Sequence, residues 1–143
     1  MKIVKTNAIL IEGYIPDSIS NIPKLREIHL HDNLFSGIIP LSFFRNLKSL
    51  EVFNIHDNGI TGKLQFSSSI VMPNLKSLIL SDNEFFGALS EDLPISLPKL
   101  EVLKIGHNGF DGTVPISYSN FSNLIEFTLG KCVFMIYVPK RIK

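Results

Sequence analysis

The sequence predicts a solenoid of the α/β type that is mostly β, and two observations lead to this prediction. The first is a repeat, because asparagine recurs every 25 residues at Asn33, Asn58, Asn83 and Asn108, each followed four residues later by glycine. A fixed period of about 20 to 29 residues is typical of stacked supersecondary units that share one continuous core. The second is the strict alternation of apolar and polar residues before each asparagine, which indicates a short strand with one buried face.

The repeat columns divide the chain into units of similar length. Units begin at residues 1, 25, 50, 75, 100 and 124, and we expect residues 1–143 to form one domain. The first unit is degraded, since Thr6 and Ile9 replace the expected leucine and asparagine. The last unit is truncated and has Cys132 in the asparagine column.

Each unit is expected to contribute one strand to a parallel sheet, because the connections between strands are too long for hairpins. The alternation predicts these strands at residues 27–31, 52–56, 77–81, 102–106 and 126–130. Prolines recur in the return half of the units, as at Pro16, Pro40 and Pro115. Because proline fixes φ and lacks an N–H, we expect this side to consist of 3₁₀ or irregular turns without regular helices.

The asparagines are expected to form a structural ladder. A buried amide offers two donors and an acceptor, so asparagines stacked at the turn after each strand can satisfy the backbone of two neighbouring units. The members are Asn33, Asn58, Asn83 and Asn108. Cys132 is a weaker member of the column because a thiol is a poor donor.

With these features in place, the chain resembles the plant-specific class of leucine-rich repeat proteins, whose units read L-x-x-L-x-L-x-x-N-x-L-x-G-x-I-P. Residues 25–40 are the clearest copy. The resemblance implies a right-handed superhelix with a concave parallel sheet, a second and shorter sheet on one flank, and an irregular or 3₁₀ convex side. Family members are extracellular: they are ectodomains of membrane-anchored receptor-like kinases and receptor-like proteins, or secreted inhibitors of wall-degrading enzymes of the polygalacturonase type.

Composition excludes several functions. A formal net charge of +1 gives no electrostatic reason to expect nucleic acid or an anionic membrane as a partner. No stretch approaches 18 apolar residues, and Lys5, Asn7 and Glu12 interrupt the N-terminal segment, so we expect neither membrane insertion nor a signal peptide here. The one cysteine cannot form the paired caps that the family carries. The chain therefore resembles an uncapped fragment, whose exposed ends favour self-association.

The outward positions of the predicted strands vary in chemistry, whereas the core positions are uniformly apolar. This contrast is typical of a recognition surface, although a merely solvated face would also tolerate it. The candidate ligand-binding residues on this concave face are Glu27, His29, His31, Val52, Asn54, His56, Ser77, Ile79, Ser81, Val102, Lys104, Glu126 and Thr128.

Other chemistry is expected to be absent. His31 and His56 should lie on adjacent strands about 5 Å apart, with Asp32 and Asp57 next in sequence, and imidazole with carboxylate can bind zinc. Solvated surface histidines are commoner, so we expect no metal, no cofactor and no catalytic residues. The sequon Asn120-Phe121-Ser122 makes Asn120 the candidate glycosylation site.

The sequence thus favours a non-catalytic recognition module, a fragment of a plant cell-surface receptor in signalling or defence that binds a protein or peptide ligand or a co-receptor. The alternatives are a secreted inhibitor of a wall-degrading enzyme and a truncated product without independent function. A concave column of one charge would favour the inhibitor, and the columns here are mixed.

Overall fold

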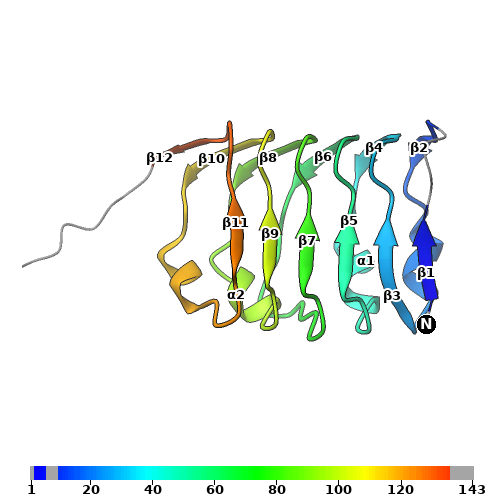
Figure 1. The fold of residues 1–143 in the computed structure, drawn as a ribbon, viewed down its shortest axis with the longest axis horizontal. Helices are drawn as coiled ribbons and strands as arrows, with labels where there is room; N and C mark the ends of the chain where they lie inside the picture. The colour runs from blue at the N-terminus through cyan, green and yellow to red at the C-terminus, as the bar shows by residue number, and fades with distance from the viewer. Residues whose placement is uncertain (1, 6–9, 136–143) are drawn as a thin grey trace, which may run out of the picture.

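The computed structural model describes residues 2–5 and 10–135, and two parallel sheets with six strands each dominate this part of the chain (Figure 1). The strands of the first sheet, in spatial order, are β1 (Lys2–Lys5), β3 (Leu25–His29), β5 (Val52–Asn54), β7 (Ser77–Ile79), β9 (Val102–Lys104) and β11 (Glu126–Thr128). The strands of the second sheet are β2 (Glu12–Tyr14), β4 (Leu34–Ile38), β6 (Gly59–Lys63), β8 (Glu84–Ala88), β10 (Gly109–Thr113) and β12 (Val133–Met135).

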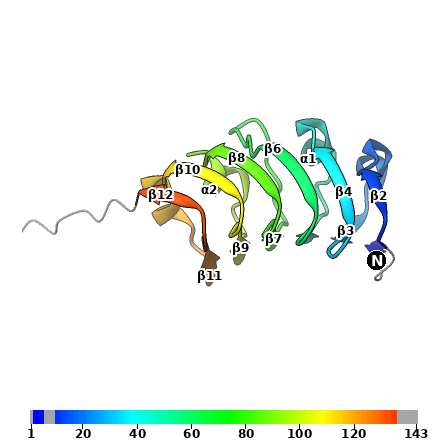
Figure 2. The same ribbon diagram turned by 90° about the horizontal axis from the view of Figure 1, so that it is seen from above.

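Successive turns of the chain follow the same path. A strand of the first sheet leads into a strand of the second sheet on the flank, and the chain then returns along the opposite side (Figure 2). The return segments include two 3₁₀ helices, η1 (Asp17–Asn21) and η2 (Ile116–Asn120), and two short α-helices, α1 (Leu41–Asn46) and α2 (Leu93–Ser96). The predicted fold class, a mostly β solenoid, is confirmed. No helix among the described residues is long and apolar enough to cross a membrane.

Four strands of the first sheet have three residues where five were predicted, and β3 begins and ends two residues earlier than predicted, because the chain bends beyond the strand ends. Asp32, Asp57, Asp82, His107 and Lys131 all have positive φ, between 53° and 59°. This left-handed conformation ends a strand, and aspartate tolerates it better than most residues. Backbone pairing between units nevertheless continues past the bend, where the Asp32 N–H donates to the His56 carbonyl at 3.0 Å.

Two further expectations about the fold were wrong. The second sheet is not the shorter one, since four of its strands have five residues whereas four strands of the first sheet have three. The return side also contains regular helix at α1 and α2. Proline fits the first turn of a helix, where its missing N–H is not needed, and Pro40 caps α1 while Pro94 lies in the first turn of α2. Burial of Phe43 and Phe44 then holds α1 against the core.

The core is a continuous apolar column between the two sheets and the return segments. The first leucines of four units, Leu25, Leu50, Leu75 and Leu100, are almost fully buried. Aromatic side chains fill the middle, where the Phe44 ring centroid lies 5.7 Å from that of Phe53 and 5.0 Å from that of Phe66.

One buried polar atom in this core lacks a partner among the described residues, and it yields a prediction. The Tyr118 hydroxyl accepts and donates no hydrogen bond there, while its ring packs on Phe121 and Phe127. Because a buried unsatisfied hydroxyl costs about 1–3 kcal/mol, we expect Tyr118→Phe to increase the free energy of unfolding by about 1 kcal/mol in urea denaturation. A loss of stability would show instead that the hydroxyl is satisfied.

The same residue predicts a pH dependence. Burial raises the pKa of the Tyr118 phenol above its usual range, because the charged phenolate is poorly solvated inside the protein. The unfolded chain therefore loses this proton at about pH 10 while the folded chain keeps it. The stability contributed by neutral Tyr118 is thus complete below about pH 10 and is lost as pH rises towards the folded pKa. In Tyr118→Phe the free energy of unfolding should therefore fall less at alkaline pH. An equal fall in the two proteins would contradict the raised pKa of Tyr118.

Candidate functional site

The candidate ligand-binding residues form two registered columns across the outer face of the first sheet, which we call the first-sheet face. Pairing aligns each strand with the next at the equivalent position of the repeat. One column contains Glu27, Val52, Ser77, Val102 and Glu126, and the other contains His29, Asn54, Ile79, Lys104 and Thr128. The residues between them, such as Ile28 and Phe53, point into the core and are fully buried.

The centre and the ends of the first-sheet face differ chemically. Val52, Ile79 and Val102 lie half-buried on three adjacent strands and form an apolar centre. Two polar contacts border it: the His29 Nε2 lies 3.0 Å from a Glu27 carboxylate oxygen, and the Lys104 ammonium forms an ion pair with Glu126 at 2.8 Å. The face therefore combines an apolar strip with charges that partly neutralise one another.

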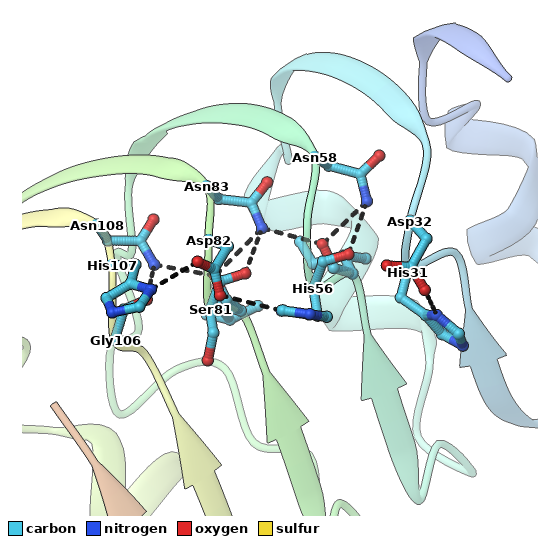
Figure 3. A network of polar contacts seen from close by, with 12 residues as sticks. His31, Asp32, His56, Asn58, Ser81, Asp82, Asn83, Gly106, His107 and Asn108 are labelled. Atoms are coloured by element: carbon cyan, nitrogen blue, oxygen red, sulfur yellow. Dashed lines mark hydrogen bonds and ion pairs between the residues drawn. The ribbon is translucent and has the colours of Figure 1, made fainter. Parts of the chain in front are cut away.

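His31, His56 and Ser81 lie beyond the strand ends, where the left-handed bend begins, and they belong to a polar rim along the edge of the face (Figure 3). Within this rim the Asp82 carboxylate lies between two imidazoles, 2.6 Å from Nδ1 of His107 and 3.2 Å from Nδ1 of His56. His31 is separate and contacts its own neighbour Asp32 at 2.6 Å.

His56 thus contacts an aspartate of the next unit, whereas His31 contacts an aspartate of its own unit. Asp82 and His107 were missed as site residues, although their separation of 25 residues places them on adjacent units. A contact across units depends on which way each side chain turns at the bend, and the repeat spacing alone does not specify this. Within the described residues, no three His, Cys, Asp or Glu side chains are arranged to hold a metal ion.

The asparagine column holds the turns that carry this rim. The Asn83 amide nitrogen lies within hydrogen-bonding distance of the carbonyls of Ile55, Leu80 and Ser81, at 2.9, 3.2 and 3.2 Å. Its oxygen accepts from the Ile60 N–H at 3.0 Å. Asn58 and Asn108 repeat this pattern (Figure 3). Each side chain thereby links its own turn to the preceding unit.

Members of the column differ in burial. Asn33 and Asn83 are 4% and 9% exposed, whereas Asn58 and Asn108 are only half-buried. The Asn33 oxygen accepts from the Ile11 N–H at 3.1 Å, which extends the column to the unit before it. Cys132 keeps one link, since its thiol donates to the Ile105 carbonyl at 3.3 Å.

Asn120 lies on the return side, away from the first-sheet face. It is the last residue of η2 and is exposed, as is Ser122 two residues later. A glycan attached there would leave the first-sheet face open.

Comparison with known proteins identifies this architecture. Residues 24–46 match the Leucine Rich Repeat family. The ectodomain of the plant membrane receptor kinase GASSHO1/SCHENGEN3 from Arabidopsis thaliana, solved with CASPARIAN STRIP INTEGRITY FACTOR 2, superimposes with a TM-score of 0.82 at 27% identity over 92% of this chain. PEPR1 with AtPEP1 gives a TM-score of 0.80 at 29% identity over 91% of the chain. The plant peptide hormone receptor RGFR1 with RGF2 gives 0.77 at 30% identity over 85%.

The described residues have the leucine-rich repeat fold of these plant receptor ectodomains. The chain spans only 15%, 18% and 19% of the three receptor structures, so it corresponds to a small part of their length. No curated protein sequence matches it. All three receptors were solved in complex with a partner, and RGFR1 is a plant peptide hormone receptor.

Proposed function

We propose that this chain is a non-catalytic recognition module of a plant cell-surface receptor and that its first-sheet face binds a peptide or a co-receptor. The observation that supports the proposal is the registered columns of varied side chains over a uniform core. Similarity to receptor ectodomains in complex with peptides favours the same use. In this proposal the parent protein is extracellular and acts in signalling or defence.

The chemistry of the face favours an extended peptide. The half-buried Val52, Ile79 and Val102 offer an apolar strip across three strands, and neighbouring Asn54 and Lys104 supply an amide and an ammonium. A ligand lying across the strands would place an apolar side chain at the centre and polar groups towards the ion pairs. The open sheet supplies contacts but does not enclose a substrate, which supports binding over catalysis.

The second function, inhibition of a wall-degrading enzyme, has less support. An inhibitor that occludes a charged cleft requires charges of one sign on its binding face. Here Lys104 is paired with Glu126, and Glu27 is beside His29. The receptor proposal accounts better for this balance of charge.

The test is a peptide selected from a displayed library on the intact chain. Replacing Asn54, Ile79 and Lys104 together by alanine is expected to weaken its binding at least about tenfold, because an apolar contact and two polar groups are lost. Isothermal titration calorimetry with the purified peptide measures the change in affinity, and far-UV circular dichroism checks that the variant is folded. Ser68→Ala, on the exposed return side, is the control and should leave the affinity unchanged. Equal binding by the triple variant, or loss with Ser68→Ala, would contradict the proposal.

We also propose that Asn120 carries an N-glycan when the chain is secreted by plant cells. Asn120→Gln and Ser122→Ala should each remove the same increment of mass, since both are required in the sequon. Asn123→Gln is the matched control three residues away and should retain the full mass. Mass spectrometry of the secreted protein decides the question, and an unmodified Asn120 would refute the proposal.

A further inference from the structure

A cavity of about 280 Å³ opens on the outer flank of the second sheet, away from the first-sheet face. Its lining comes from β4, β6 and β8 and from the segments that follow β4 and β6, while Phe44 of α1 contributes from the return side and Leu80 from the core. The floor is apolar and consists of the core residues Phe44, Leu64 and Phe85. Figure 2 shows the three strands side by side along this flank.

The cavity exists because β6 has small outward residues between two bulky neighbours. Thr61 is paired opposite Ile38 of β4, and Phe86 of β8 is paired opposite Lys63. Between Thr61 and Lys63, Gly62 has φ +107°, a conformation that side chains rarely adopt, so the position stays empty. A Cβ there would lie only 3.0 Å from the Ile38 Cγ2. The backbone conformation therefore preserves the space.

Lys63 adds a positive charge at the edge of this apolar cavity. Its stem lies across Gly87, with Cγ, Cδ and Cε at 3.5–3.6 Å from the place of a Cβ there. Among the described lining residues Lys63 carries the only charge, and it forms no ion pair with any described residue. The cavity thus has one unmatched cation beside an apolar floor.

The rim of the cavity, which is distinct from the polar rim of the first-sheet face, extends the apolar surface. The side chains of Ile38 and Phe86 are 68% and 47% exposed on either side of the opening. A small molecule inside the cavity would leave this rim in water, whereas a polypeptide could fill the cavity with one side chain and cover the rim with its neighbours. Protein interfaces typically have a side chain of one partner buried in a pocket of the other, with apolar residues around the pocket.

We propose that this flank binds a partner polypeptide, which inserts a bulky apolar side chain between Ile38 and Phe86 and places an adjacent carboxylate on Lys63. Charge complementarity selects the acidic neighbour, and the cavity is large enough to accept a ring-sized side chain. This contact is separate from ligand binding on the first-sheet face, so either can hold without the other.

The test uses ¹⁵N-labelled chain titrated with acetyl-Asp-Phe-amide and followed by NMR. Amide shifts are expected at Gly62, Lys63 and Phe86, whereas the strands of the first sheet should not respond. Acetyl-Lys-Phe-amide and acetyl-Asp-Ala-amide should each bind more weakly, because one loses the charge and the other the ring. Equal binding of acetyl-Lys-Phe-amide, or shifts confined to the first sheet, would overturn the proposal. Equal binding of 3-phenylpropionate would replace the polypeptide by a small acid and also overturn it.

Variants test the two features of the cavity. Thr61→Phe should fill the space and abolish the shifts, while Thr61→Ser keeps it open and serves as the control. Phe86→Ser, which removes a rim wall at an exposed position, gives an independent loss if Thr61→Phe fails to fold. Lys63→Gln should weaken binding about two- to fivefold, as expected for an exposed ion pair, and Lys99→Gln should not. Unchanged affinity in both Lys63→Gln and Phe86→Ser would refute the site.

Discussion

Replacing Phe53 by alanine is expected to lower the free energy of unfolding by about 3–5 kcal/mol, because the variant loses buried apolar area and leaves a cavity. Phe53 is fully buried in β5, and its ring centroid lies 5.8 Å from that of Phe43 and 5.7 Å from that of Phe44. Both partners belong to α1, so the substitution also removes the contact that holds this helix. Urea denaturation followed by circular dichroism measures the effect.

Phe86→Ala is the matched control, since it removes the same side chain from the neighbouring sheet where Phe86 is half exposed. Its cost should be below about 1.5 kcal/mol because little buried area is lost. Similar losses for the two variants would show that the packing around Phe53 is not as described.

Replacing Asn83 by leucine is expected to cost about 2–4 kcal/mol, because several buried backbone groups lose their partner at once. The Ile60 N–H and the Ile55 carbonyl belong to the preceding unit, so the cost reflects contacts between units as well as the local turn. Leucine has the same branched arrangement of side-chain heavy atoms as asparagine but cannot form the hydrogen bonds. The denaturant midpoint measures the loss.

Asn74→Leu provides the contrast. The Asn74 side chain makes two exposed hydrogen bonds: it donates to the Lys48 carbonyl at 3.0 Å and accepts from the Lys99 ammonium at 3.2 Å. Because both are exposed to water, their loss should cost less than about 1 kcal/mol. A small effect at Asn83 would mean that the turns do not depend on the asparagine column.

Asn83 also connects stability with the polar rim. It follows Asp82 directly, and Asp82 contacts both His56 and His107. A displaced turn at Asn83 should therefore change the imidazole signals of His56 and His107 in NMR spectra, while His29, paired with Glu27 on the sheet, remains unchanged. The stability of the solenoid and the shape of the polar rim thus depend on the same residues.

The sequence by itself determined the stacking of units, because leucine, asparagine and glycine recur at fixed offsets and every unit must bury the same face against its neighbours. Residues such as Ile79 and Lys104 could be placed side by side from the 25-residue spacing alone, and the strand register agrees. Local alternation was sufficient to distinguish core from surface, since each strand has only two faces.

Only the tertiary structure decided where the chain bends and which side chains meet across units. The helix α1 forms because Phe43 and Phe44 are buried in the core, whereas Pro40 before it alone favoured an irregular turn. Asp82 joins His56 to His107 through side-chain directions that follow the left-handed bend, and repeat spacing carries no information on these directions. The cavity at Gly62 likewise depends on residues from three units, Ile38, Thr61 and Phe86, whose combined shape no single copy of the repeat contains.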